Sequence, residues 1–243
     1  MYLFDAHCHL QDERLTPHLD AAMERAAQAG VTGLMCCGTS ESDWPLLPGI
    51  AKRFAGVHLS FGLHPWFVGD RSERWLDSLK TFLTGTPSAV GEIGLDHALD
   101  QATFADQETV LLAQIHLANE LQRPVTLHCR RAWGRLLELL DEKGWPAHGF
   151  ALHSYSGSAE LVQPLTRRGA FFSFSGAISF EQNRKGREAV CAAPLERLLI
   201  ETDAPNLSPA HLTEVLKAVA KIRGIQEQEL AETTTKNARL LWA

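Results

Sequence analysis

The sequence predicts an α/β protein folded as one (β/α)8 barrel. Three observations predict it. Eight short apolar or β-rich segments recur along the chain, and each is followed by a helix-like segment. No linker or low-complexity stretch interrupts them, and a length of 243 residues is ordinary for one such barrel. The competing architecture, an open doubly wound sheet, would normally carry a glycine-rich phosphate loop after its first strand, whereas here that strand ends in His7-Cys8-His9.

The eight expected strands are short runs of apolar and β-branched residues, typical of strands buried on both faces. Val57-His58-Leu59-Ser60-Phe61 and Leu198-Leu199-Ile200 are examples. The expected bounds are 3–8, 32–37, 57–62, 88–92, 124–128, 149–153, 170–174 and 198–202.

The intervening segments have helical spacing of apolar residues and end at glycines suited to a left-handed C-terminal cap. Gly30, Gly144 and Gly169 end the expected helices 21–29, 131–143 and 158–168, and a longer helix is expected over 104–121. Ser208-Pro209 is typical of an N-cap followed by proline at the first helical position. A last helix is expected at about 226–241.

Composition excludes several classes of protein. Hydrophobic residues make up 45% and charged residues 21%, as in globular domains, and no stretch has the length and apolarity of a membrane span. The first residues lack the basic start and long apolar run of a signal peptide, so a cytoplasmic location is expected. A net charge of −6 does not support a wide nucleic-acid-binding surface, although bound cations would supply local positive charge. The odd cysteine count and the absence of a CxxC pair argue against disulfides and a zinc knuckle; the five are Cys8, Cys36, Cys37, Cys129 and Cys191.

The end of the first strand carries the first chemical signal. Side chains two apart on a strand share a face, so Asp5, His7 and His9 are expected to point into the barrel near its mouth. Two imidazoles in this arrangement can bind one metal ion, and Asp5 is a candidate hydrogen-bond partner for a ligand imidazole. Taken alone, the motif is equally compatible with two core histidines.

Three later strands also end in residues that bind metals. Glu92 is an acid in an apolar, glycine-flanked strand end, where a buried carboxylate needs a cation or strong donors. The alternative to metal binding is a salt bridge from Glu92 to an arginine or lysine inside the barrel. His128 and His153 end the next two strands, and two such histidines at the catalytic end are harder to attribute to packing.

The last strand carries two acids, Glu201 and Asp203. We expect Asp203, at the very end, to belong to the site, and Glu201, lower down, to pair with a basic side chain inside the barrel.

Together these residues predict a dinuclear metal site at the C-terminal ends of the strands. A bridging Glu92 would have His7 and His9 on one side and His128 and His153 on the other. Two cations can clamp the attacking and leaving oxygens of a displacement and lower the pKa of a water. Asp203 would ligate the first metal and take the proton from that water. Nitrogen and oxygen ligands without thiolate suit zinc, manganese or magnesium.

The motifs resemble those of the TatD family of metal-dependent deoxyribonucleases, a group of amidohydrolase-like barrels. They occur in the family's order across residues 5 to 205, and residues 235–241 resemble the family's closing helix. The matching pieces are Asp5-Ala6-His7-Cys8-His9, Gly62-Leu63-His64-Pro65, Gly91-Glu92-Ile93-Gly94-Leu95-Asp96, His128-Cys129-Arg130, His153-Ser154-Tyr155-Ser156-Gly157 and Glu201-Thr202-Asp203-Ala204-Pro205.

The resemblance implies one barrel domain over residues 1–243 and the metal ligands His7, His9, Glu92, His128, His153 and Asp203. It implies that His7, His9, Glu92 and Asp203 hold one ion, and that Glu92, His128 and His153 hold the other. It also implies that His64 and Arg130 contact a substrate phosphate, and a guanidinium suits phosphate oxygens. The chain departs from the family pattern in short segments after Pro205 and after Asp96, which puts the substrate preference in doubt and favours a more open cleft.

Three functions follow as alternatives. The first is a divalent-metal-dependent nuclease acting on DNA ends or single-stranded nucleic acid, with no membrane and no obligate protein partner. The second is a hydrolase of a small ester, amide or phosphoester on the same metal centre, and the third is a non-catalytic metal-binding scaffold. Three aromatic residues would stack a base in the first case or line an apolar pocket in the second: Trp66, Trp133 and Tyr155. The alternative is that they only pack against neighbouring side chains.

Overall fold

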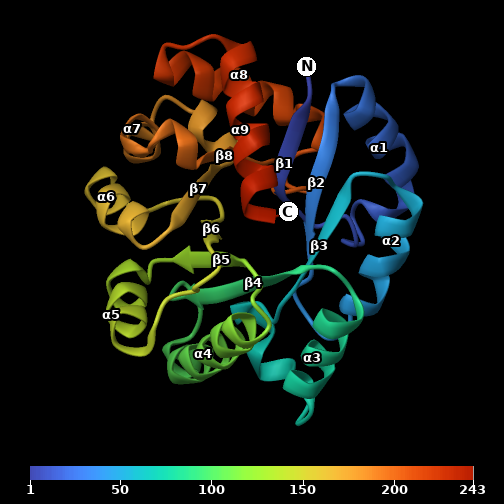
Figure 1. Ribbon diagram of the computed structural model, residues 1–243, viewed down its shortest axis with the longest axis vertical. Coiled ribbons are helices and arrows are strands. Elements are labelled where there is room, and N and C mark those ends of the chain that lie inside the picture. Colours follow the sequence, from blue (N-terminus) through green and yellow to red (C-terminus); the bar gives the residue numbers. More distant parts are fainter. Residues whose placement is uncertain (243) are drawn as a thin grey trace.

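The computed structural model describes residues 1–242 and has eight parallel strands surrounded by helices (Figure 1). Each strand pairs with the next one along the chain, in the order β1 to β8. The predicted (β/α)8 barrel is therefore confirmed, and most strand bounds lie within two residues of those expected. The strands are β1 (Leu3–Cys8), β2 (Val31–Cys37), β3 (Val57–Phe61), β4 (Ala89–Asp96), β5 (Val125–Arg130), β6 (Phe150–Leu152), β7 (Ala170–Phe174) and β8 (Leu198–Ile200).

The barrel closes between β1 and the segment that follows β8. Cys8 pairs in parallel with Ala204, the His9 amide donates to the Ala204 carbonyl at 2.8 Å, and the Asp203 amide donates to the His7 carbonyl at 3.0 Å. These hydrogen bonds fix the backbone of two parts of the predicted site relative to each other, the His7-Cys8-His9 motif and Asp203.

Helices follow the strands as predicted. They are α1 (Leu19–Gln28), α2 (Leu47–Arg53), α3 (Trp75–Gly85), α4 (Phe104–Glu120), α5 (Trp133–Lys143), α6 (Ala159–Arg167), α7 (Arg184–Ala192), α8 (Leu212–Arg223) and α9 (Glu227–Trp242). Gly30 and Gly169 follow their helices with φ of 86° and 92°, which a glycine adopts without steric cost. Ser208 precedes the 3-10 turn Pro209–His211 as expected, but its side chain makes no capping hydrogen bond.

The helix α9 covers the end of the barrel opposite the site. Its residues Leu241 and Trp242 pack with Phe4 and Ala89, near the starts of β1 and β4, and with Leu199 in the middle of β8. In Figure 1 the end of α9 accordingly lies near the middle of the barrel. Among residues 1–242, no helix combines the length and apolarity needed to cross a membrane. Ala243, the last residue of the predicted domain range, lies outside the described residues.

Candidate metal centre

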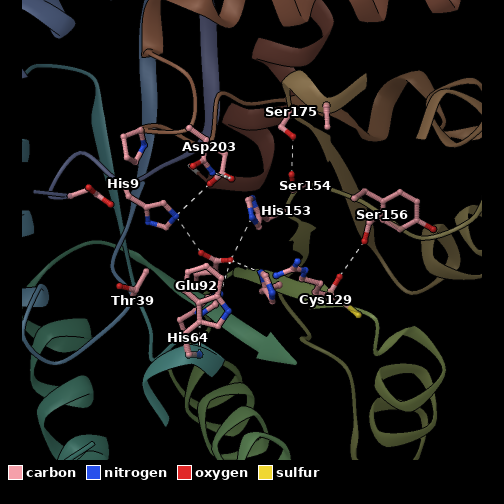
Figure 2. Close-up of a pocket in the computed structure, with 18 of the residues that line it drawn as sticks. His9, Thr39, His64, Glu92, Cys129, His153, Ser154, Ser156, Ser175 and Asp203 are labelled. Carbon is pink, nitrogen blue, oxygen red and sulfur yellow. Dashed lines mark hydrogen bonds and ion pairs between the residues drawn. The ribbon is translucent and has the colours of Figure 1, made fainter. Parts of the chain in front are cut away.

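The predicted site residues converge at the C-terminal mouth of the barrel (Figure 2). His7, Glu92 and His128 lie in β1, β4 and β5. His9, His153 and Asp203 lie just beyond the ends of β1, β6 and β8. Residues nearly 200 positions apart are therefore neighbours, because all parallel strands end at the same face of the barrel.

Glu92 lies at the centre of the cluster and is buried. Its carboxylate oxygens are within 3.5 Å of a ring nitrogen of five histidines. The distances are 2.9 Å to His128 Nδ1, 3.2 Å to His7 Nε2, 3.4 Å to His9 Nε2, 3.4 Å to His64 Nε2 and 3.5 Å to His153 Nε2.

Glycines around Glu92 allow this close approach, as the sequence suggested. Gly94 has a φ of 155°, and a Cβ there would lie 1.9 Å from the His128 carbonyl oxygen. Any larger residue at this position would push β4 away from β5 and His128 away from Glu92.

The cluster stays charged although it is buried. Burial alone would raise the pKa of Glu92, but the imidazoles of His153, His64 and His7 hold that pKa well below its usual range. Burial likewise opposes ionisation of Asp203, and His153 and His9 outweigh it, so the pKa of Asp203 is lowered. Both carboxylates are therefore anionic at neutral pH, which is the state that ligates a cation.

Polar groups behind the rings fix which nitrogen faces Glu92. His9 Nδ1 lies 2.8 Å from the Cys37 carbonyl oxygen, so Nδ1 carries the proton and donates it. His153 Nδ1 lies 2.9 Å from Glu201 Oε1. In both rings Nε2 is left to face the centre, which is the orientation that a histidine ligand needs.

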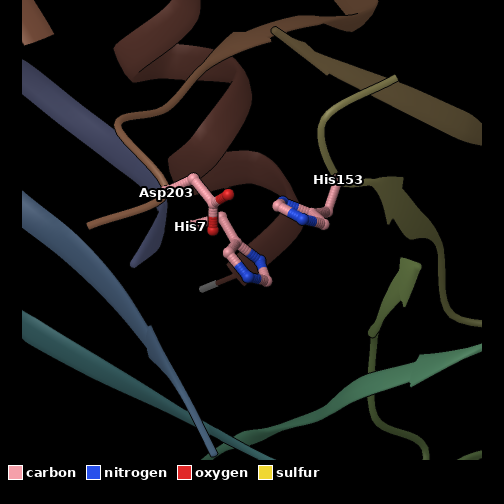
Figure 3. Close-up of side chains that lie close together, drawn as sticks. All are labelled: His7, His153 and Asp203. Carbon is pink, nitrogen blue, oxygen red and sulfur yellow. The ribbon is translucent and has the colours of Figure 1, made fainter. Parts of the chain in front are cut away.

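A bound cation explains these side-chain positions better than packing of the histidines in a core without one. His7 Nε2 and His9 Nε2 lie 3.2 Å apart beside the same Glu92 oxygen, and their lone pairs repel unless a cation or proton lies between them. Ligand atoms of His7, His9 and Glu92 all lie within 4.8 Å of one another. The same holds for His7, His153 and Asp203 (Figure 3), and for His64, Glu92 and His128.

His64 differs from the other histidines of the cluster. Its Nδ1 accepts a hydrogen bond from the Trp66 amide at 3.1 Å, so the proton of the neutral ring is on Nε2. Burial lowers the pKa of His64 to about 4, which keeps the ring neutral at pH 7. Its Nε2–H, which faces Glu92, is therefore a hydrogen-bond donor and lacks the lone pair that a metal ligand must offer.

The Asp203 backbone adopts a left-handed conformation with φ of 53°. This turn directs its carboxylate back over the barrel, where Oδ1 lies 3.6 Å from His9 Nε2. Asn206 donates to the other oxygen, Oδ2, at 2.7 Å. Only residues 205–208 separate Ala204 from the next 3-10 turn, which agrees with the short segment seen in the sequence.

The expectation for Asp5 was wrong. Its carboxylate accepts hydrogen bonds from the amide and hydroxyl of Thr202, with the amide at 2.9 Å, and makes none to an imidazole. The strand register shifts between Asp5 and Cys8, so alternation from His7 back to Asp5 does not hold. Asp5 instead ties β1 to the residue before Asp203. Glu201 has a partner inside the barrel as expected, and that partner is the imidazole of His153 together with the Ser154 amide at 2.8 Å.

The buried Asp5 gives a prediction for the pH dependence of stability. Burial raises the pKa of Asp5 from 3.8 to about 7, against the opposing hydrogen bonds from Thr202. The contribution of Asp5 to stability is then fully present below pH 3.8 and is lost as the pH rises through about 7. We expect Asp5→Asn, which cannot ionise, to gain about 1–3 kcal/mol relative to the wild type above pH 7 and little near pH 4. Urea unfolding of both proteins in chelator across this range measures the difference. A difference in unfolding free energy between the two proteins that is constant with pH contradicts a raised pKa at Asp5.

Asp96 is a residue of the site to which sequence reasoning gave no role. It is fully buried at the end of β4, and its Oδ2 accepts from Trp66 Nε1 at 2.8 Å. The same oxygen lies 3.4 Å from His128 Nε2 and 3.9 Å from Arg130 Nη1. Its position at the end of the Gly91–Asp96 motif, on the same face as Glu92 and Gly94, was the signal that could have identified it.

The cluster opens into a cleft of about 1130 Å³. Arg130, Lys185 and Arg14 line it, with Asp12, Glu13 and Asp43. Arg14 pairs with Asp12 at 2.7 Å, and Arg130, whose side chain is 55% exposed, lies 3.9 Å from Asp96 Oδ2. Three cationic side chains therefore line the cleft, with acidic residues beside them.

Imidazoles and carboxylates gathered at the mouth of a (β/α)8 barrel define the class of barrel metallohydrolases. Over residues 4–243 the chain matches the family described as TatD related DNase. It is 34% identical to the 3′-5′ ssDNA/RNA exonuclease TatD of Citrobacter koseri, across 99% of this chain and 98% of that protein. It is 30% identical to the uncharacterized metal-dependent hydrolase YabD of Bacillus subtilis, across 99% and 98% of the two chains.

Solved structures agree with these relatives. The crystal structure of YjjV, a TatD homolog from Escherichia coli K12, superposes with a TM-score of 0.93 at 28% identity and covers 99% of this chain and 97% of its own. This chain belongs to the TatD family. It is therefore a metal-dependent hydrolase, and the non-catalytic scaffold loses its support.

Proposed function

We propose that this protein is a nuclease that hydrolyses phosphodiester bonds at the ends of single-stranded DNA or RNA with two divalent cations. The observation that carries the proposal is the buried Glu92 carboxylate, surrounded by imidazoles and open to a cleft that also presents Arg130. The name of the Citrobacter koseri relative, a 3′-5′ ssDNA/RNA exonuclease, supports the same substrate class.

The cleft suits a strand end better than a long duplex. Its volume of about 1130 Å³ exceeds the range that usually holds one small ligand. Few exposed cations line it, so binding along many phosphates is not supported. A strand end needs only a few phosphate contacts, and in this proposal Arg130 and Lys185 make them.

The ligand set divides around Glu92. In this proposal His7, His9, Glu92 and Asp203 hold one ion, and Glu92, His128 and His153 hold the other. In such sites divalent cations polarise a phosphoryl oxygen and lower the pKa of water. The nitrogen and oxygen donors suit zinc, manganese or magnesium.

The protein groups have separate tasks in hydrolysis. Asp203, anionic and at the edge of the cleft, accepts the proton of the attacking water. His64 donates its Nε2–H to a phosphate oxygen, and Arg130 binds a second one through its guanidinium. His153 is held by Glu201 and keeps its orientation through the reaction.

His64 can be separated from the metal ligands by experiment. We expect His64→Ala to keep the wild-type metal content and to lower kcat/KM by about 100-fold, because it removes one donor to the developing charge. His128→Ala should instead lose bound metal. Elemental analysis of both variants, beside the kinetics, makes the comparison. Equal metal loss in the two variants would make His64 a ligand and refute its role as a donor.

The proposed activity is tested with metal-stripped protein and end-labelled oligonucleotides of single-stranded DNA, single-stranded RNA and duplex DNA. Magnesium, manganese or zinc is added in turn, with the label at either end. We expect a ladder on single strands that appears only with metal and shows which end is attacked. Protein that binds metal in stoichiometric amounts but cuts none of these substrates would favour the small ester, amide or phosphoester hydrolase.

A further inference from the structure

An exposed tryptophan lines the cleft beside the candidate metal centre. Trp66 is 56% exposed, although a side chain of this size is usually covered in a folded protein. It lies at the start of the 3-10 helix Pro65–Asp70, directly after the loop that carries His64. Of the aromatic residues that line the cleft, Phe67 is half-buried, and Tyr155 and Phe174 are buried.

The indole is held in place although it is exposed. Its Nε1–H donates to Asp96 Oδ2 at 2.8 Å, and its backbone amide donates to His64 Nδ1 at 3.1 Å. The imidazole of His64 meets the indole edge to face, with ring centroids 5.1 Å apart. These contacts hold the ring, and Trp66 is nevertheless 56% exposed where it lines the cleft. An aromatic ring that is already ordered loses little side-chain entropy when a ligand stacks on it.

Trp133 and Tyr155, the other two aromatic residues that the sequence offered for base stacking, do not present such a surface. Tyr155 is buried and donates to the Ser158 carbonyl, and its ring packs on Phe172. Trp133 does not line the cleft and packs edge to face against Tyr155 at 4.9 Å. Trp133, at the start of α5, and Tyr155, in the loop after β6, therefore serve packing.

The buried Asp96 places the indole close to the groups that would hold a phosphate. One carboxylate oxygen contacts Trp66 Nε1, lies 3.9 Å from Arg130 Nη1 and lies 3.4 Å from His128 Nε2. A nucleotide presents a flat base and an anionic phosphate joined by one sugar. Indole, guanidinium and metal ligand around a single carboxylate match that pair of features.

We propose that Trp66 is a stacking platform for the nucleobase beside the scissile phosphate, and that Asp96 is the residue that positions it. This inference rests on the proposed nuclease function. Stacking accepts any base because every base has a π-face, so Trp66 selects for the presence of a base and not for its identity. A strand end that lacks its base should then be a poorer substrate.

The test compares oligonucleotides that differ only in the terminal nucleotide, which carries thymine or is a tetrahydrofuran abasic unit. For the wild type we expect kcat/KM to be about 5- to 150-fold lower on the abasic end, mainly through KM, because stacking contributes about 1–3 kcal/mol per base. Trp66→Leu should cut both substrates at the same low kcat/KM. Trp66→Phe, which keeps an aromatic face but loses the bond to Asp96, should keep part of the preference.

Controls separate stacking from structural damage. Tyr2→Leu removes an aromatic that is 72% exposed and outside the cleft, and it should behave as the wild type. Asp96→Ala should lose the preference, and Asp96→Asn should restore it, because the amide oxygen still accepts from the indole. Metal content must match the wild type in each variant.

Two outcomes overturn the stacking role and leave the proposed function standing. If Trp66→Leu discriminates against the abasic end as strongly as the wild type does, Trp66 does not stack on the base. If instead the wild type cuts both substrates with the same kcat/KM, and Trp66→Leu lowers both values equally, Trp66 serves the fold alone. A wild type that cuts no nucleic acid refutes the proposed function itself, and the stacking role falls with it.

Discussion

Replacing Glu92 with glutamine is expected to lower kcat by about 1000-fold or more and to reduce the bound metal. Glutamine keeps the shape of the side chain but offers one neutral oxygen, so it cannot bridge two cations. Several kcal/mol of stabilisation of transition-state charge depend on those cations, and each 1.4 kcal/mol is about tenfold in rate. Metal content by elemental analysis and kcat on single-stranded DNA are the two measurements.

A matched control for this variant is Glu138→Gln on α5, because Glu138 is exposed and pairs only with Arg135 near the surface. It should keep both metal and activity. Circular dichroism of Glu92→Gln should show the wild-type fold, since the buried charge is removed together with the cations that balance it. Wild-type turnover in Glu92→Gln would refute a metal centre built on this residue.

Replacing Asp203 with asparagine is expected to separate turnover from metal binding. Asparagine is among the residues that tolerate a left-handed backbone, so the φ of 53° at this position is preserved. In the proposed ligand set His7, His9 and Glu92 would remain, so most of the metal should stay bound. The amide cannot accept the proton of the attacking water, and kcat should fall by about 100- to 10 000-fold.

The corresponding control is Asp12→Asn, because Asp12 lines the same cleft but pairs with Arg14. We expect its kcat to stay within a few-fold of the wild type. Substantial activity in Asp203→Asn would remove Asp203 from proton transfer and leave it at most a ligand. Loss of metal equal to that of Glu92→Gln would instead assign it a structural role in the centre.

The fold was predictable because strand ends, helix-ending glycines and the strand–helix alternation are local signals. The site followed from the same pattern, because parallel strands bring His7, Glu92, His128, His153 and Asp203 to one face. The rule that residues two apart on a strand share a face held for His7 and His9, which both face Glu92. It failed at Asp5, where a register shift in β1 changes the alternation.

Contacts between distant segments could not be predicted. The tautomer of His9 depends on the Cys37 carbonyl, which is 28 residues away along the chain. Asp96 acquires its role only when β5 brings His128 and Arg130 beside it. Such partners are set by tertiary packing, and no local residue pattern encodes them.

The proposed dinuclear centre, in which Glu92 would hold both divalent cations, is the basis of the proposed function. It is tested most directly by anomalous diffraction from crystals of this protein grown with Mn²⁺. We predict two peaks about 3.5–4 Å apart. One should lie against His7, His9 and Asp203, the other against His128 and His153, with an oxygen of Glu92 on each. Peaks confined to surface carboxylates, or no peak near Glu92 at saturating Mn²⁺, would contradict a metal centre built on Glu92.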